Sequence, residues 1–273
     1  MTAVTPGCLY VVATPIGHRD DMSARAISTL HAVTVIAAED TRHSRPLLQY
    51  HGVDTPLVAL HEYNERDAVD ALVRRLLAGD AVALISDAGT PLISDPGFRL
   101  VRAARAAGVR CVPIPGACAA IAALCASGLP SDRFVFEGFL PPKAAARRTR
   151  LQQLSGDART IIFYESSHRI AESVADMRDI LGATREAVLA RELTKMFETI
   201  LGEPLGELAT RIATDPDQQR GECVVLVAGR GEEADAKVTE GQRVFAILRA
   251  ELPPAKAAKL AAVISGAPRK ALY

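Results

Sequence analysis

Short apolar runs that end in small or acidic residues recur along the first half of the chain. The clearest is VALIS at 82–86, which is bounded by glycines and followed by a helical pattern that stops at Gly108. A continuous apolar run of this length is typical of a strand buried on both faces of a parallel sheet. Asp95 stands directly before a proline, so we expect it to cap the next helix, over about 95–107.

The same alternation of apolar runs and amphipathic segments continues on both sides of this unit. It predicts strands at 9–13, 33–38, 57–60 and 109–114, and helices from about 23 and at 44–50, 65–78 and 117–127. Strands that alternate with helices form mostly parallel sheets. We therefore expect an α/β domain over residues 1–128.

The pattern changes after residue 128. Residues 129–159 join a Gly-Phe-Leu-Pro-Pro run to a basic segment, which we interpret as a hinge followed by a basic helix. A second α/β domain is predicted over 160–230, with strands at 160–164, 187–191, 196–201 and 222–228 and helices at 168–181 and 204–213. The polar residues 229–240 suit a linker into a helical tail over 231–273, with helices at about 239–250, 254–264 and 268–272.

Composition narrows the class of protein. The 32 Lys and Arg are balanced by 32 Asp and Glu, so any contact with RNA has to come from a local basic patch. Aromatic residues make up only 4% of the chain, which argues against an extended base-stacking platform. The five cysteines include no CxxC pair, and we expect no metal site and a reducing, cytoplasmic location. No apolar run approaches the ~20 residues of a membrane span.

The residues that could bind a ligand are concentrated in the loops that follow the predicted strands. Open α/β sheets bind ligands at the carboxyl ends of their strands, and 87–97 places two Asp, two Pro and two Gly at one such end. The loop after the first strand, ATPIG at 13–17, lacks the glycines of a dinucleotide fingerprint and the GK[ST] ending of a P-loop. These loops therefore indicate a ligand cleft of another kind.

Six segments carry a resemblance to a known family. They are ISDAGTPLISDPG (85–97), VATPIGHRDD (12–21), AAEDTRHS (37–44), PIPGACA (113–119), FYESSHR (163–169) and RELTKMFET (191–199). In their order along the chain they resemble the tetrapyrrole-methylase superfamily, and specifically its ribosomal RNA branch. The resemblance implies two α/β domains with S-adenosylmethionine (SAM) in the cleft between them, a homodimer, and a small helical C-terminal tail.

The resemblance also implies a reaction and a set of cofactor contacts. The reaction is SAM-dependent 2′-O-ribose methylation of a cytidine in the decoding centre of 16S rRNA, on the small ribosomal subunit. The first loop departs from the family at His18, where Asn is usual, so we expect a changed contact there. The cofactor-binding residues carried over are Pro15, Asp87, Ala88, Gly89, Ile93, Ser94, Asp95, Ala117, Cys118, Tyr164, Leu193, Glu222 and Cys223.

A ribose hydroxyl is weakly acidic, so its attack should gain from a general base, worth roughly 10²–10⁴ in rate. The candidates are the titratable groups at predicted strand ends, namely Glu39, Asp40, Glu165, His168, Glu192 and Lys195. Among these we favour Glu165, Glu192 and Lys195 as the catalytic residues.

Basic residues supply the candidate RNA contacts. Lys143, Arg147, Arg148 and Arg150 place four cations in eight residues, which suits either an RNA patch or a solvated helix face. Arg42 and either Arg169 or Arg191 are expected to bind phosphates at the cleft. Lys256 and Lys259 lie in the tail, where RNA contact and dimer packing are equally good interpretations.

Two other functions compete with this reading. A tetrapyrrole C-methyltransferase of the uroporphyrinogen or precorrin type would share the fold, but its first loop is typically of the glycine-rich GPGD type, unlike ATPIGHRDD. A non-catalytic SAM-binding factor in ribosome assembly would bind the cofactor without turnover.

Overall fold

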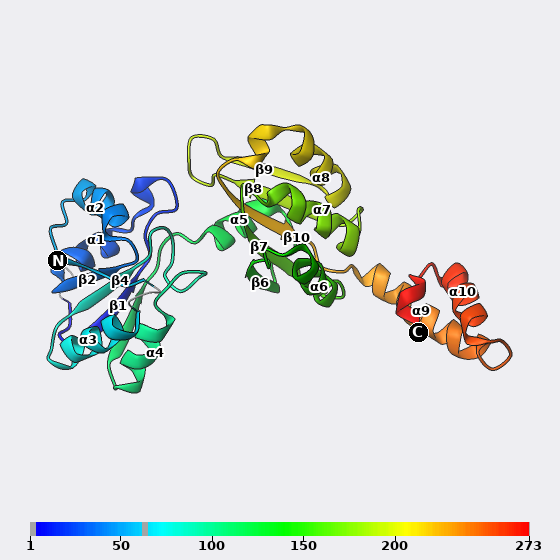
Figure 1. Cartoon of the computed structure of the whole chain (residues 1–273), viewed down its shortest axis with the longest axis horizontal. Coiled ribbons are helices and arrows are strands. Elements are labelled where there is room, and N and C mark those ends of the chain that lie inside the picture. The colour runs from blue at the N-terminus through cyan, green and yellow to red at the C-terminus, as the bar shows by residue number, and fades with distance from the viewer. Residues whose placement is uncertain (1–3, 62–64, 273) are drawn as a thin grey trace.

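The computed structural model describes residues 4–61 and 65–272, and its first domain is built on a parallel five-stranded sheet (Figure 1). The strand order is β3-β2-β4-β1-β5, with every neighbouring pair parallel. The strands are β1 (Cys8–Val12), β2 (Val35–Ala38), β3 (Leu57–Ala59), β4 (Val82–Ile85) and β5 (Arg110–Ile114). The parallel sheet predicted from the apolar runs is confirmed.

Helices cover both faces of this sheet, which explains why its strands are mostly apolar. Helices α1 (Ala24–Ala32) and α2 (Thr41–Tyr50) pack on one face. A short 3-10 helix at Arg19–Asp21 precedes α1 in the chain. Helices α3 (Glu65–Leu77) and α4 (Phe98–Ala106) pack on the other. Both faces of β4 are thereby buried.

Helix α4 begins later than the Asp-Pro pair predicts. Its N-cap is Gly97, with φ of 116°, and the side chain of Asp95 makes no capping bond. Leu92 and Ser94 also have positive φ values, of 74° and 66°, so the backbone leaves β4 in a contorted loop instead of entering a helix. The prediction that Asp95 caps this helix is therefore wrong, and its carboxylate is left in the loop.

The second domain has a mixed sheet in the order β6-β7-β10-β8-β9. Strands β6 and β7 are parallel, and the other neighbours are antiparallel. The strands are β6 (Phe134–Phe139), β7 (Thr160–Ser166), β8 (Glu186–Arg191), β9 (Thr199–Pro204) and β10 (Glu222–Val227). Helices α6 (Ala144–Leu154), α7 (Ile170–Leu181) and α8 (Leu205–Thr214) pack on one face, and a 3-10 helix at Pro216–Gln219 precedes β10.

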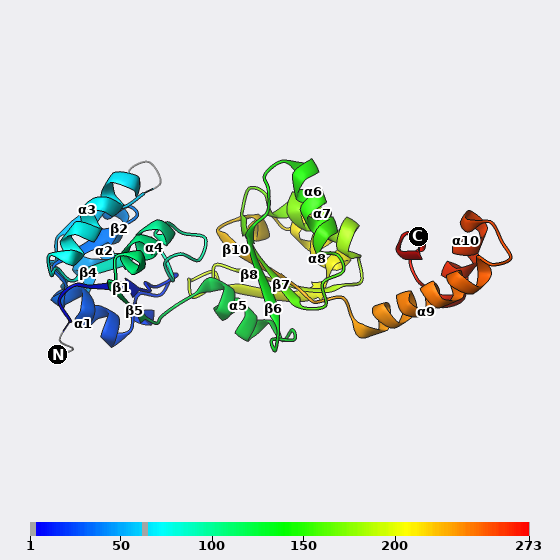
Figure 2. The same ribbon diagram turned by 90° about the horizontal axis from the view of Figure 1, so that it is seen from below.

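The opposite face of this sheet is covered by α5 (Ala119–Ser127), which follows the first domain in the chain. Ala120, Ala123 and Leu124 pack against strand residues that include Ile162 and Val188. The chain therefore crosses to the second domain before α5 begins, as Figure 2 shows. This packing favours a division before α5, although the domain limits given above stay predictions.

Residues 129–159 differ from the hinge that the sequence led us to expect. They contain β6, an edge strand paired with β7, and then α6, whose Leu151 is fully buried. The Gly and Pro residues that suggested a hinge stand at a bulge and at the strand's end, since the register shifts between Phe136 and Gly138. The prediction of a hinge is therefore wrong, and the prediction of a basic helix after it is confirmed by α6.

The C-terminal tail is helical and projects beyond the second domain (Figures 1 and 2). It contains α9 (Glu232–Leu248), α10 (Pro254–Ser265) and a 3-10 helix at Arg269–Leu272, packed around a small core of their own. Helix α9 starts inside the segment expected to be a linker, so that linker is wrong beyond residue 231. Among the helices in 4–61 and 65–272, none is long and apolar enough to cross a membrane.

Candidate functional site

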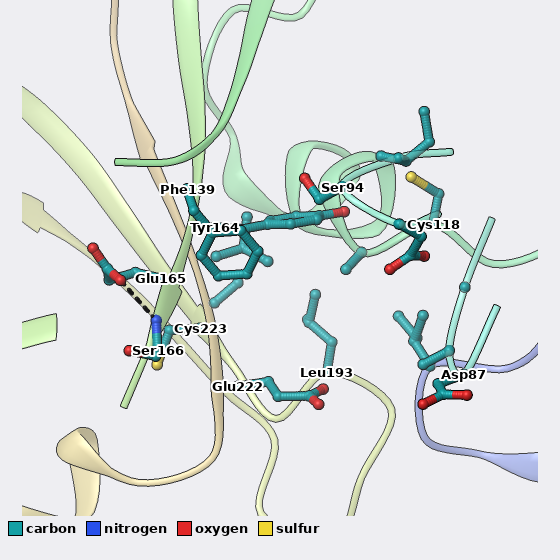
Figure 3. Close-up of a pocket in the computed structure, with 18 of the residues that line it drawn as sticks. Asp87, Ser94, Cys118, Phe139, Tyr164, Glu165, Ser166, Leu193, Glu222 and Cys223 are labelled. Carbon is teal, nitrogen blue, oxygen red and sulfur yellow. Dashed lines mark hydrogen bonds between the residues drawn. The ribbon is translucent and has the colours of Figure 1, made fainter. Parts of the chain in front are cut away.

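A cavity of about 520 Å³ lies between the two domains (Figure 3). Its volume falls within the roughly 300–1,000 Å³ that is usual for small-molecule sites. The first domain contributes the loop after β4, and the second contributes the ends of β7 and β8 and the start of β10. Elements far apart in the sequence thus meet around one space, as the predicted cleft requires.

Most residues that the resemblance assigns to the cofactor line this cavity. They are Asp87, Ala88, Gly89, Ile93, Ser94, Asp95, Cys118, Tyr164, Leu193, Glu222 and Cys223. Pro15 and Ala117 lie behind the lining and support the turn after β4. The carbonyl oxygen of Pro15 accepts a bond from the Gly89 amide at 3.3 Å, and that of Ala117 accepts one from the Thr90 hydroxyl at 2.8 Å.

Several lining residues were missed by the sequence analysis. They include Ile16, Thr90, Phe139, Ser166, Ser167 and Gly221. The two serines follow Glu165 directly within a quoted motif, so their position was a usable signal. Phe139 belongs to β6, the strand that was interpreted as a hinge.

Two loops at the cavity carry unusual backbone conformations. Within the described ranges, the non-glycine residues with positive φ are Leu92, Ser94, Glu192 and Thr194, at 52–74°. One pair lies in the loop after β4 and the other in the loop after β8. Such conformations cost of order 1 kcal/mol or more each and concentrate at ligand sites. Their placement here supports the cavity as a functional site.

Two carboxylates mark the first-domain side of the cavity. Asp87 Oδ1 accepts a hydrogen bond from the Asp40 amide at 3.1 Å, which ties the ends of β4 and β2 together. Burial raises the pKa of Asp95 to about 6, and the neighbouring charge of Asp87 contributes, while a hydrogen bond with Ser86 opposes the shift. This side can therefore attract a cation or bind hydroxyl groups.

We expect Asp95→Asn to raise the melting temperature of the ligand-free protein at pH 8 and to leave it nearly unchanged at pH 4. The folded protein holds the Asp95 proton up to a pKa of about 6, against 3.8 ordinarily. The stability that this proton supplies is fully present below about pH 4 and is lost as the pH rises through 6. Because solvent reaches part of the group, the expected gain is about 1 kcal/mol, or roughly 2–4 °C. Calorimetry at both pH values checks this, and equal shifts would contradict it.

The second-domain side of the cavity is mostly apolar. Ala190, Leu193 and Val224 belong to the cluster beneath α5, and burial raises the pKa of the Cys223 thiol to about 11. Tyr164 stands over them, and its hydroxyl accepts a bond from the Ala120 amide at 3.1 Å. This wall suits a flat, uncharged ring.

Polar groups also lie at the start of helix α5, which borders the cavity. Its N-cap residue, Cys118, makes no side-chain capping bond, and both Cys118 and Ala119 line the cavity. The Ala120 amide in the first turn is bonded to the Tyr164 hydroxyl, and the partial positive charge of the helix start favours an anionic group beside it. The cavity thus combines carboxylates, an apolar wall and an anion-binding end.

Glu165 lies at the cavity wall but is fully engaged by the protein. Its carboxylate accepts a hydrogen bond from the Ser166 amide at 2.9 Å (Figure 3). It also accepts bonds from the Ser173 hydroxyl at 2.6 Å and from Arg169 at 2.9 Å. Only 1% of the side chain is exposed. This arrangement suits a residue that fixes the end of β7 better than one that takes a proton from a substrate.

Glu192 and Lys195 form a second engaged group, in the loop after β8. Glu192 Oε1 accepts bonds from Lys195 Nζ at 2.8 Å and from the Glu222 amide at 2.9 Å. Burial opposes both charges, but these contacts outweigh it, lowering the pKa of Glu192 and raising that of Lys195. A raised pKa favours the protonated ammonium, which argues against Lys195 as a general base, and its catalytic role stays a prediction.

The basic residues of α6 are largely neutralised. Arg147 is buried, with Nε 2.7 Å from Asp176 Oδ2. Arg148 pairs with the same Asp176, and Arg150 with Glu137 at 2.7 Å. A buried arginine cannot reach a phosphate, so the structure contradicts Arg147 as an RNA contact. The sequence did not reveal the burial of Arg147, because spacing alone does not show which face of α6 meets α7.

We expect Arg147→Met to lower the free energy of unfolding by about 3 kcal/mol, because it leaves the buried carboxylate of Asp176 short of a partner. RNA affinity of the folded protein should not change. The exposed Lys143 is the matched control, and Lys143→Met should leave stability unchanged. Urea denaturation measures the first quantity. Equal stability of the two variants would contradict the structural role.

The other predicted RNA contacts differ in their surroundings. Arg42 is exposed but pairs with Asp40, whose pKa the bonds from Arg42 lower to about 2. Arg169 is turned inward and also donates to the Leu140 carbonyl at 2.6 Å. Lys143, Lys256 and Lys259 are exposed. His168, a candidate base, is exposed as well.

Comparison with known proteins agrees with this geometry. Residues 8–209 match the family of Tetrapyrrole (Corrin/Porphyrin) Methylases, and residues 235–273 match the RsmI C-terminal HTH domain. Among solved structures, the methyltransferase CobJ aligns with a TM-score of 0.60 at 21% identity, covering 82% of this chain and 94% of its own. Uroporphyrin-III C-methyltransferase from Thermus thermophilus, complexed with S-adenyl homocysteine, aligns at 0.57 and 16%, covering 81% and 97%. These likenesses show the fold.

Curated relatives are similar over nearly their whole length. The chain is 60% identical to a protein of Pseudomonas aeruginosa (99% of this chain, 96% of the relative), 58% to one of Xylella fastidiosa (98% and 98%) and 51% to one of Escherichia coli O157:H7 (98% and 93%). Each relative is named Ribosomal RNA small subunit methyltransferase I. This chain therefore belongs to the tetrapyrrole methylase family, in the group that contains these ribosomal RNA methyltransferases.

Proposed function

We propose that this protein transfers a methyl group from SAM to the 16S rRNA of the small ribosomal subunit. The observation that carries the proposal is the cavity between the domains, which gathers the segments that the resemblance assigns to SAM. The full-length similarity to relatives named Ribosomal RNA small subunit methyltransferase I supports the choice of RNA as the acceptor.

The lining of the cavity fits SAM on each side. The apolar wall of Ala190, Leu193 and Val224 suits the adenine ring, and the N-terminal end of α5 suits the carboxylate of the methionine part. Asp87 and Asp95 suit its hydroxyl, amino and sulfonium groups. When bound, SAM supplies the methyl group on a positively charged sulfur, so the protein's work is mainly to position donor and acceptor.

Within this proposal, Glu165, Glu192 and Lys195 position the cavity walls. Glu165 fixes the turn that presents Ser166 and Ser167, and the Glu192–Lys195 pair holds the loop that carries Leu193. Each acts through hydrogen bonds within the protein.

The finer assignments of the resemblance belong to the same proposal. The acceptor atom is the 2′-oxygen of a cytidine in the decoding centre, the substrate is the assembled small subunit, and the enzyme works in the cytoplasm as a homodimer. The motif order of the ribosomal RNA branch supports these assignments.

The test uses SAM labelled in its methyl group and small ribosomal subunits from cells that lack the activity, with uroporphyrinogen offered in parallel. We expect label in a single cytidine ribose after RNA digestion and mass spectrometry. Label on the tetrapyrrole would keep the fold and the cofactor but overturn the RNA function. SAM binding without transfer to either acceptor would identify a non-catalytic factor.

A further inference from the structure

A second hollow opens beside the cavity, at the start of helix α4. It has a volume of about 400 Å³ and shares Glu39, Ser94 and Asp95 with the wall of the cavity. Phe98 and Arg99 form its outer side. A molecule in this hollow would meet a ligand of the main cavity across the three shared side chains. The inference below concerns the methyl acceptor and rests on the proposed function.

The exposed face of α4 continues outward from this hollow. Phe98, Arg102 and Arg105 follow the i, i+4, i+7 spacing of one helix face, with Arg99 beside them. All four side chains are exposed, and Phe98 is 62% exposed, while Leu100 on the other face is fully buried. A single exposed ring is common on protein surfaces, so what distinguishes Phe98 is its place in the lining of the hollow.

Two of the arginines on this face differ from those of α6 in lacking a carboxylate partner among the described residues. Within the part of the chain that the structure describes, Arg102 and Arg105 form no ion pair. By contrast, Arg148 and Arg150 each face a carboxylate at 2.7 Å or less. The chain has no net positive charge, so contacts with phosphates depend on local cations of this kind. The arginines on the exposed face of α4 supply such local cations near the edge of the cavity.

We propose that an rRNA strand docks along α4, with its phosphates on Arg99, Arg102 and Arg105 and the acceptor nucleotide in the hollow, its base against Phe98. Single-stranded RNA is commonly bound in this way, by cations along the backbone and aromatic rings under unstacked bases. Glu39 and Asp95 then face the ribose from the shared wall, where carboxylates accept hydrogen bonds from hydroxyl groups. Figure 2 shows α4 on the side of the first domain that faces the second.

The first test is the double variant Arg102→Ala/Arg105→Ala, assayed with small ribosomal subunits and labelled SAM. We expect KM for the subunits to rise at least tenfold, with kcat at saturation and SAM affinity unchanged. The slope of log affinity against log salt should fall by about 1.4, because two phosphate contacts of single-stranded RNA are lost. The matched control is Arg178→Ala/Arg211→Ala on α7 and α8, which cover the face of the second sheet opposite the cavity.

A second variant tests the hollow itself. Phe98→Ala should lower kcat/KM about tenfold or more, and Phe98→Tyr, which keeps a ring, should restore most of it. If both variants on α4 match the control in KM and salt slope, the docking path is wrong. Loss in Lys256→Ala/Lys259→Ala alone would move the RNA to the tail. A wild-type protein that methylates no subunit would overturn the proposed function instead, which the same assay distinguishes.

Discussion

Replacing Gly17 by valine is expected to weaken SAM binding at least a hundredfold while the protein stays folded. A Cβ at this position would lie 2.6 Å from Lys195 Cγ, 2.6 Å from the Thr194 hydroxyl and 3.0 Å from the Leu193 carbonyl. These atoms belong to the loop after β8, so the side chain would push the two domains apart at the cavity. Gly17 lacks the positive φ that would itself disfavour a side chain, and the three atoms nearest to the added Cβ all belong to the second domain.

The contact beside Gly17 explains why this junction is sensitive. The backbone amide of His18 donates to the Thr194 hydroxyl across the domains at 3.0 Å. The departure from Asn at position 18 leaves this backbone contact in place, and the His18 ring instead accepts a bond from the Asp20 amide.

Isothermal titration with SAM measures the predicted loss at Gly17. Gly156→Val is the matched control, because Gly156 also has an ordinary φ and a Cβ there would meet open space. The melting temperatures of the two variants should stay within a few degrees of the wild type. SAM affinity of Gly17→Val close to that of the control would show that the cavity does not depend on this junction.

Replacing Glu165 by glutamine is expected to lower the free energy of unfolding by about 3 kcal/mol, because Arg169 loses its buried counter-charge. This loss is at the low end of the range for breaking a buried ion pair, because Arg169 still donates to the Leu140 carbonyl. Urea denaturation measures it. The glutamine amide also cannot accept all three of the bonds that the carboxylate accepts, so the turn at Ser166 should loosen.

Activity separates this structural role from a catalytic one. If Glu165 positions the wall, Glu165→Gln raises KM for SAM and keeps the pH profile of kcat, whereas loss of a general base would flatten the acid limb of that profile. Ser173→Ala removes one of the same hydrogen bonds without touching the cavity, and it should reproduce a smaller form of the same KM effect. A flattened profile in Glu165→Gln alone would restore Glu165 as the proton acceptor.

The first domain could be predicted well because its strands are short, mostly apolar runs, and those of β2 and β4 lead into acidic residues. Such runs identify buried parallel strands from sequence alone. The second domain was harder, since β6 mixes phenylalanine with Glu137 and Gly138 and lies at a sheet edge. A half-exposed edge strand has no continuous apolar run, so its composition resembled a hinge.

The residues of the candidate site also divide into those that the sequence predicts and those that it does not. Residues in dense motifs, such as Asp87 and Ser94, could be placed at the cavity from their sequence context. The partners of charged residues could not, because a carboxylate that pairs with Arg147 stands 29 positions further along the chain. Pairing distances of this kind decide whether a cation binds RNA or stabilises the fold, and only the packing of α6 on α7 reveals them.

The separate core of the tail has a consequence for how this protein family changes. Gly229 marks the exit of the chain from the second sheet, where a Cβ would collide with the Ala158 carbonyl, so the point of attachment is fixed by backbone packing. Beyond it, Val244, Ala261 and Leu272 stabilise the tail without help from either α/β domain. A module joined in this way can be lost, gained or exchanged in evolution while the methylase body keeps its chemistry.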